Sequence, residues 1–238
     1  NFLGFSVVIV NLYLFLIPAF VFVLLGMLPP RNESGTRLPA RQVKNYESSK
    51  ISPFQWLGVF FILLAVFFMI LTLIRFWQAD THYALGYNLD RAQEFQMAYP
   101  ELLQSFQMRG SEPVFLDELA FNSAMMSLIF INQKDATTAA SFVQNALTGS
   151  NKVTLEHPNN IVFWKTKTRI LYALSQLDEN YTPLALEAVK KANMLAPTEA
   201  KISYNLGVLY GQIGDVKKGV KVLEETVRLK PNYLDAYY

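Results

Sequence analysis

The sequence predicts an all-α protein in which two transmembrane helices precede an α-solenoid of helix-turn-helix repeats. Two uncharged apolar runs within the first 77 residues predict the membrane helices. From residue 78 onward, small, aromatic and turn residues recur at a period of about 34 residues, a pattern typical of stacked helix pairs. The composition, 52% hydrophobic and 14% aromatic, is also more apolar than a purely soluble chain requires.

We assign residues 1–30 to the first transmembrane helix and residues 53–77 to the second. Residues 1–30 contain no charged side chain, and the second run is uncharged as far as Ile74. Each run is longer than the roughly 20 apolar residues that cross a bilayer. Trp56 and Trp77 stand at the two ends of the second run, where tryptophan anchors a helix at the membrane interface.

Other interpretations of the two apolar runs are less well supported. Their length and lack of charge disfavour buried core helices. No basic leader precedes the first run and no small-residue cleavage site follows it, which disfavours a signal peptide. Neither run has an ionisable residue near its middle, so neither suggests a transport path or a proton relay.

The loop between the spans, residues 31–52, indicates how the chain is oriented. It contains five basic residues against Glu33 and Glu47. By the positive-inside rule this loop is cytoplasmic, and its basic side chains contact anionic lipid. Both ends of the chain, including residues 78–238, are then extracytoplasmic, although Arg75 at the end of the second span argues for the opposite orientation.

The most regular repeat spans residues 200–233. Gly207 follows Leu206 at the point where a small residue allows two paired helices to approach closely, and Gly214 with Asp215 predicts the turn between them. The same pattern upstream predicts repeats at about 79–112, 113–160 and 161–199, and a truncated fifth repeat begins at residue 234.

The repeats differ in length. The repeat at 161–199 contains about five extra residues near its turn, at 178–183, and the repeat at 113–160 holds larger insertions. Because the chain begins at Asn1 inside an apolar run and stops within a repeat, we expect it to be an internal piece of a longer protein.

These repeats resemble the tetratricopeptide repeat (TPR) family, with some departures. Ser203 stands where the family has tryptophan, and Gly219 and Thr226 replace small alanines. The glycine costs roughly 1 kcal/mol of helix propensity relative to alanine. The resemblance implies a concave groove, lined by the first helix of each pair, as the binding surface. The residues that it places in this groove are Tyr83, Tyr87, Asp90, Arg91, Asp117, Phe121, Lys165, Arg169, Tyr172, Lys201, Tyr204 and Gln212.

Aromatic side chains interleaved with charges suit a protein or peptide partner, or a glycan, because rings supply rigid contact area and charges fix the register. The alternative is that these side chains are solvated helix faces with no partner. The groove also lacks part of the basic and asparagine pattern that the family's carboxylate-binding members use.

The sequence provides no sign of catalysis or of a cofactor. We find no nucleophile constellation, phosphate-binding glycine loop or metal-ligand spacing, and the chain has no cysteine. Residues 78–238 contain 15 Lys and Arg against 17 Asp and Glu, which disfavours nucleic-acid binding. Of the two histidines, we expect His82 to pack between helices and His157 to lie in a loop.

The whole chain also resembles the C-terminal part of bacterial O-antigen ligase or polymerase family membrane proteins that carry TPR repeats. The segments that support this resemblance are residues 159–166 and 172–175, together with the two spans joined by a short basic loop. The resemblance implies a multi-pass protein of the bacterial cytoplasmic membrane that transfers lipid-linked glycans. Its active site would lie upstream of Asn1.

Three hypotheses follow for the whole protein. It is the non-catalytic C-terminal part of a glycan ligase or polymerase, or a membrane-tethered TPR scaffold that recruits a protein. Small-molecule transport, the third, is disfavoured by two uninterrupted apolar spans. The first predicts about ten further spans upstream by analogy with the family, whereas the second predicts a short upstream sequence.

Overall fold

The computed structural model describes residues 16, 18–21 and 53–237 of this chain. The loop predicted at 31–52 lies outside the described residues. So does the first predicted span apart from Leu16 and residues 18–21, which are helical. By its contacts the chain divides into two compact units, residues 1–69 and 70–238.

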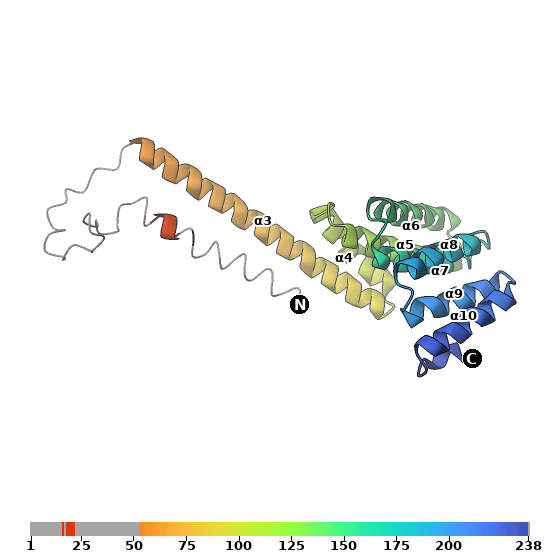
Figure 1. Ribbon diagram of the computed structural model, residues 1–238. Coiled ribbons are helices and arrows are strands. Elements are labelled where there is room, and N and C mark those ends of the chain that lie inside the picture. The colour runs from red at the N-terminus through yellow and green to blue at the C-terminus, as the bar shows by residue number, and fades with distance from the viewer. Residues whose placement is uncertain (1–15, 17, 22–52, 238) are drawn as a thin grey trace, which may run out of the picture. The chain divides into compact units, whose positions relative to one another are not determined.

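The described residues form helices and contain no strand. Figure 1 shows these helices in chain order from α3 to α10. Their bounds are α3 Pro53–Arg91, α4 Phe95–Met108, α5 Pro113–Asn132, α6 Ala136–Glu156, α7 Ile161–Leu174, α8 Tyr181–Leu195, α9 Ala200–Gln212 and α10 Val216–Leu229, followed by the short 3-10 helix η1 Leu234–Ala236.

Helix α3 is 39 residues long and continues without a break past the predicted end of the second span at residue 77. Two helices in the described part of the chain are long and apolar enough to cross a membrane, Gln55–Arg91 in α3 and Pro113–Asn132, which is α5. The most apolar stretch of α3 has a mean hydropathy of 3.0 and no buried residue, whereas 56% of the corresponding stretch of α5 is buried. Burial of this kind is typical of a core helix, so α5 belongs to the interior of the repeat domain.

The helices of residues 79–233 form consecutive pairs. Helix α5 pairs with α6, α7 with α8 and α9 with α10, and the last part of α3 contacts α4 through Gly86 against Leu102 and His82 against Glu101. In Figure 1, α9 and α10 lie side by side near the C-terminus. Each apolar cluster spans neighbouring pairs: for example, Leu171 of α7, Val189 of α8 and Ile202 of α9 belong to one cluster. A single pair therefore does not bury its own apolar face, as expected of a solenoid.

Three of the four pairs use the same turn. Gln93, Lys134 and Gly214 have a left-handed backbone, with φ of 65°, 64° and 85°. In each turn the left-handed residue donates its N–H to the carbonyl three residues before it, and the next residue donates to the carbonyl five residues before it. These bonds satisfy carbonyls at the end of the first helix and reverse the chain within three residues.

The extra residues of the longer repeats lie in two different places. Helices α5 and α6 have 20 and 21 residues, against 13 and 14 in α9 and α10, so the insertions of the second repeat lengthen its helices. In the third repeat the turn between α7 and α8 is six residues long, 175–180, rather than three. The other two extra residues lengthen α7 and α8 by one residue each relative to α9 and α10.

The prediction that Gly207 allows close approach of the paired helices is confirmed. A Cβ atom on Gly207 would lie 2.8 Å from Leu223 Cγ, and one on Gly86 in the first pair would lie 2.7 Å from Leu102 Cγ. Gly219 has a similar role from the opposite helix, because its Cβ would lie 2.9 Å from the Gly207 carbonyl oxygen. At this position glycine is needed for packing, despite its low helix propensity.

Candidate functional site

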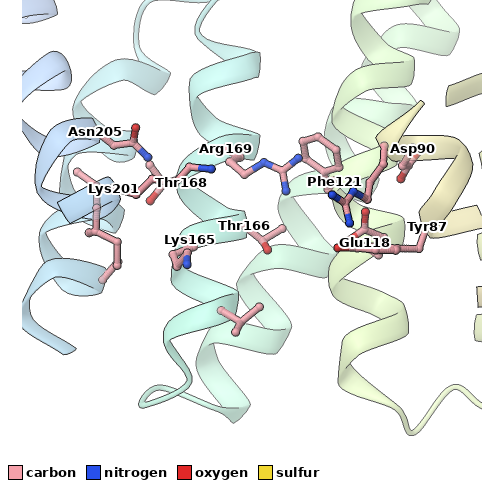
Figure 2. A pocket seen from close by; sticks show the side chains of 15 residues that line it. Tyr87, Asp90, Glu118, Phe121, Lys165, Thr166, Thr168, Arg169, Lys201 and Asn205 are labelled. Carbon is pink, nitrogen blue, oxygen red and sulfur yellow. The ribbon is translucent and has the colours of Figure 1, made fainter. Parts of the chain in front are cut away.

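A groove of about 450 Å³ crosses the first helices of all four pairs. Figure 2 shows its labelled side chains extending from Lys201 and Asn205 of α9, past Lys165 and Arg169 of α7, to Glu118 and Phe121 of α5 and Tyr87 and Asp90 of α3. Because the pairs stack in one direction, residues about 30 to 50 positions apart in sequence come to line one continuous surface.

Most of the predicted site residues lie on this surface. Those that line the groove are Tyr87, Asp90, Arg91, Phe121, Lys165, Arg169 and Lys201. Tyr172 and Tyr204 line an adjoining hollow of about 240 Å³ that shares Thr168, Arg169 and Asn205 with the groove. The structure therefore brings nine of the twelve predicted residues to one face.

The other three predicted residues lie beside or beneath this surface. The side-chain amide of Gln212 donates to the hydroxyl of Tyr172 at 3.1 Å. The ring of Tyr83 stacks on Phe115 at 4.8 Å between centroids and on Tyr87 at 5.9 Å. Asp117 is only 3% exposed. Tyr83 and Asp117 therefore support the groove from within rather than lining it.

The basic side chains of the groove are held in different ways. The Arg169 guanidinium lies 3.8 Å from the ring centroid of Phe121, and that of Arg91 lies 5.8 Å from the ring centroid of Tyr87. Such contacts leave the guanidinium N–H groups free to bind a ligand. Lys165 instead forms an ion pair with Glu199, at 2.6 Å between Nζ and Oε1.

Three acidic side chains, Asp90, Asp117 and Glu118, lie beneath these cations, and we call them the floor acids. They are 4%, 3% and 8% exposed. The Asn122 side chain, also fully buried, donates to Asp90 Oδ1 at 2.6 Å and to the Phe95 carbonyl at 3.0 Å. Asp90 Oδ2 and Asp117 Oδ1 are buried without a hydrogen-bond donor, which is costly for an ionised carboxylate.

The protonation of the floor acids follows from this burial. Burial raises the pKa of Asp117 to about 7, against a hydrogen bond from Thr166 and the charge of Arg169, which lower it. Burial, and then the charge of Asp90, raise the pKa of Glu118, and Arg169 opposes this. Burial also raises the pKa of Asp90. The Glu118 and Asp90 carboxyls act on each other in opposite directions, because Glu118 lowers the pKa of Asp90 whereas Asp90 raises the pKa of Glu118.

Glu118, Asn122, Thr166, Thr168 and Asn205 belong to the site but were not predicted. The adjacent acids at 117 and 118 were a usable signal, because two consecutive positions on a core-facing helix place at least one carboxyl near the interior. The polar residues of α7 and α9 had no comparable signal. Among the described residues, no group of three or more His, Asp or Glu could hold a metal ion.

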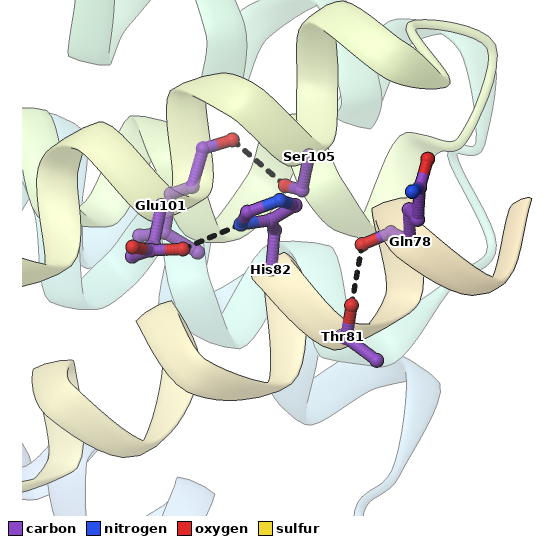
Figure 3. Close-up of polar contacts among 6 residues, drawn as sticks. Gln78, Thr81, His82, Glu101 and Ser105 are labelled. Carbon is purple, nitrogen blue, oxygen red and sulfur yellow. Dashed lines mark hydrogen bonds and ion pairs between the residues drawn. The ribbon is translucent and has the colours of Figure 1, made fainter. Parts of the chain in front are cut away.

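His82 has the packing role that we predicted from the sequence. Its Nδ1 lies 2.6 Å from Glu101 Oε2, and both side chains are about a quarter exposed. Figure 3 shows this contact joining the last part of α3 to α4, near Ser105, whose hydroxyl donates to the Leu102 carbonyl at 2.8 Å. His157 follows the end of α6 and is exposed, with its ring 5.7 Å from that of Phe163.

The fold resembles solved TPR proteins. A thermophilic TPR protein of Thermus thermophilus matches with a TM-score of 0.52 and 18% identity over 64% of this chain and 75% of that one. MamA from Desulfovibrio magneticus matches at 0.49 with 21% identity, covering 67% and 79%. PilF of Pseudomonas aeruginosa matches at 0.46 with 17% identity, covering 68% and 65%. No family model and no curated protein matches the sequence. The prediction of an all-helical fold that resembles TPR solenoids is therefore confirmed for the matched part of the chain.

Proposed function

We propose that this chain is a membrane-anchored TPR module that binds an extended segment of a partner protein in the groove of its first helices. The observation that carries the proposal is the groove itself, which brings two aromatic rings, four basic side chains and several hydrogen-bonding groups to one surface. An extended segment suits it because the polar groups lie in a row across α3, α5, α7 and α9. A glycan partner is the less favoured alternative.

The anchor is residues 53–77 of α3, together with the predicted first span. Trp56 and Trp77 are 62% and 67% exposed at the two ends of the apolar stretch. At 1.5 Å per residue their Cα atoms are separated by roughly 30 Å, which matches the hydrocarbon thickness of a bilayer. Large apolar side chains between them, such as Phe60, Leu64 and Phe68, are more than half exposed, and lipid would cover them.

A cross-linking experiment tests the groove as the binding surface. Because the chain has no cysteine, a photo-cross-linker can be attached through Asn205→Cys in the groove. Lys217→Cys, exposed on α10 outside the groove, is the matched control. We expect a discrete protein adduct in native membranes from position 205 only. Equal adducts from both positions, or none from position 205, would contradict the proposal.

The proposed orientation places residues 78–238 outside the cytoplasm and the basic loop inside. Lys217→Cys should react with a membrane-impermeant maleimide in intact cells. Ser48→Cys, in the predicted loop, should react only after the cells are permeabilised. The reversed labelling pattern would show that the repeats face the cytoplasm, as the position of Arg75 suggests.

The larger proposal is that the module is the non-catalytic tail of a cell-envelope O-antigen ligase-like or polymerase-like protein. It is supported by the succession of apolar spans, short basic loop and TPR solenoid along the chain. Sequencing the reading frame upstream of Asn1 tests it. Many spans with a basic external loop would support the glycan-transferring protein, and one or none would leave the tethered adaptor.

A further inference from the structure

We infer that the groove is selective for an acidic peptide segment, and that protonation of the floor acids beneath it strengthens this binding. This inference rests on the proposed function of the groove. It specifies the charge of the partner and a dependence of its binding on pH, neither of which follows from the fold or the sequence pattern.

Positive and negative charges lie at different depths in the groove. Every charged residue that lines the groove and is accessible to a ligand is basic: Arg91, Lys165, Arg169 and Lys201. The acidic residues that line it, Asp90 and Glu118, are buried. A ligand in the groove thus meets positive charge, although residues 78–238 as a whole contain more acidic than basic residues. Charge complementarity of this kind selects an acidic partner.

Three of these cations are available to a ligand. In the described part of the chain, Lys165 has an ion-pair partner in Glu199, but Arg91, Arg169 and Lys201 have no carboxylate within 4.0 Å. The Arg169 guanidinium lies 3.8 Å from the ring centroid of Phe121, and that of Arg91 lies 5.8 Å from the ring centroid of Tyr87. Planar, oriented guanidinium groups bind carboxylates through two parallel hydrogen bonds.

The floor acids are coupled to the charge of Arg169. The Arg169 charge lowers the pKa of all three acids. By reciprocity, each ionised floor acid offsets part of the positive charge that Arg169 presents to a ligand. The unpartnered Asp90 Oδ2 and Asp117 Oδ1 mark the places where this negative charge lacks a local donor.

The groups that act on the floor acids come from three helices. Helix α3 contributes Asp90 itself and Tyr83, whose pKa is raised first by burial and then by the charges of Glu118, Tyr87, Asp117 and Asp90. Helix α5 contributes Asp117, Glu118 and Asn122, and α7 contributes Thr166 and Arg169. Helices α4 and α6 also pack on α5, but no described residue of theirs is among the groups that shift these three pKa values.

The consequence is a groove whose charge depends on pH near neutrality. At pH 8 the floor acids are largely ionised and offset part of the Arg169 charge. At pH 5.5 more of them are protonated, and less of the Arg169 charge is offset. Glutamate side chains of a peptide ligand, with an ordinary pKa of about 4.3, remain ionised at both values. Binding of an acidic peptide should therefore take up protons at neutral pH.

The test uses the full chain in nanodiscs and three fluorescent peptides, repeats of Glu-Ser, Gln-Ser and Lys-Ser with equal length. Fluorescence polarisation at constant ionic strength gives their affinities at pH 8 and pH 5.5. We expect the Glu-Ser peptide to bind at least about tenfold more tightly than the Lys-Ser peptide, and to gain up to about tenfold in affinity at pH 5.5. Lys201→Gln should weaken its binding several-fold, whereas Lys217→Gln, the same charge change outside the groove, should not.

Glu118→Gln separates the pH control from simple charge selection. At pH 8, this variant should bind the Glu-Ser peptide with an affinity closer to that of the wild type at pH 5.5. It should also take up fewer protons on binding, as measured by calorimetry in buffers of different ionisation enthalpy. Unchanged pH dependence and proton uptake in this variant would overturn the control by the floor acids.

The remaining outcomes distinguish this inference from the proposed function. If the Gln-Ser or Lys-Ser peptide binds best, and Asn205→Cys still cross-links a protein, the groove is a peptide site of a different specificity and the inference is wrong. If an oligogalacturonate binds and no peptide does, the groove takes an anionic glycan and the inference is likewise wrong. If neither peptide nor glycan binds and position 205 gives no adduct, the proposed function itself fails.

Discussion

At the scale of single residues, glycine has two different effects in the last helix pair. Gly219 faces the backbone of the partner helix: a Cβ there would lie 2.9 Å from the Gly207 carbonyl oxygen and 3.3 Å from the Gly211 nitrogen. Gly211, also in a helix, has nothing within 4 Å of its Cβ position. Helix propensity alone makes no distinction between the two positions.

We therefore expect Gly219→Ala to lower stability even though alanine is the better helix former. Overpacking against backbone atoms costs roughly 1–3 kcal/mol, which outweighs the gain in propensity of roughly 1 kcal/mol. Gly211→Ala is the matched control and should be neutral or stabilising. Thermal unfolding followed by circular dichroism at 222 nm distinguishes the two. Stabilisation by both substitutions would contradict the close approach of α9 and α10.

The floor acids predict that stability depends on pH in a direction opposite to that of most surface carboxylates. Burial raises the pKa of Asp117 to about 7, well above its ordinary value, and also raises that of Glu118. A raised pKa contributes stability that is fully present at acid pH, below the unfolded-state pKa, and is lost as the pH rises through the folded-state pKa. The repeat domain should therefore be more stable near pH 5 than near pH 8.

Glu118→Gln should reduce this loss, because an amide has no charge to bury. We expect the variant to gain melting temperature relative to wild type at pH 8 and to show little or no gain at pH 5. Glu187→Gln, at an exposed position on α8, is the control and should follow the wild type at both values. A variant that is equally destabilised at both pH values would show that Glu118 acts through packing alone.

At the scale of elements, the turn that three of the four pairs share is a repeated unit whose sequence is not uniform. The left-handed position is Gly214 in the last pair, but Lys134 and Gln93 in the second and first. The hydrogen bonds around all three are the same. A side chain at this position costs about 1 kcal/mol or more. Residues that have a Cβ atom, asparagine excepted, rarely adopt a left-handed backbone.

Lys134→Gly should accordingly stabilise the domain by about 1 kcal/mol. Lys134→Ala retains the Cβ and removes only the exposed side chain, so it should leave the stability nearly unchanged. Urea denaturation gives both changes in the free energy of unfolding, provided that its dependence on urea concentration is the same in the variants and the wild type. A loss of stability in the glycine variant would mean that the flexibility added to the unfolded chain exceeds the strain removed from the turn.

At the scale of the whole molecule, the chain combines a helix with a fully exposed apolar stretch and a repeat domain with a buried core. Exposed apolar surface of this extent marks a binding or membrane surface in a folded protein. We propose that residues 53–77 span the membrane. Insertion of this second span therefore decides on which side of the membrane the repeats lie.

Arginines in the middle of that span should therefore change the topology. Each costs roughly 2.5–3.5 kcal/mol at the centre of a membrane helix. The double substitution Leu64→Arg and Phe68→Arg should keep the repeats on the cytoplasmic side and abolish maleimide labelling at Lys217→Cys in intact cells. Leu155→Arg with Met194→Arg, at positions 82% and 75% exposed in the repeat domain, is the control and should be labelled normally. Unchanged labelling of the first variant would argue that residues 53–77 do not span the membrane.

The sequence by itself determined the all-helical, TPR-like fold of the repeats, because repeat period, turn residues and small residues at helix contacts are local signals. It placed Gly207 at a close approach and Gly214 with Asp215 at a turn, and it placed nine of twelve chosen residues on one surface. Only the tertiary structure decided which charges are buried. Asp90 and Glu118 lie 28 positions apart and meet only because consecutive pairs stack.

The tertiary structure also decided where the extra residues of the long repeats lie, in the helices of the second pair and mainly in the turn of the third. No local pattern distinguishes a longer helix from a longer turn when both remain compatible with stacking. Burial depends on what the neighbouring pair covers, and this in turn sets the pKa of each floor acid and the charge that the groove presents.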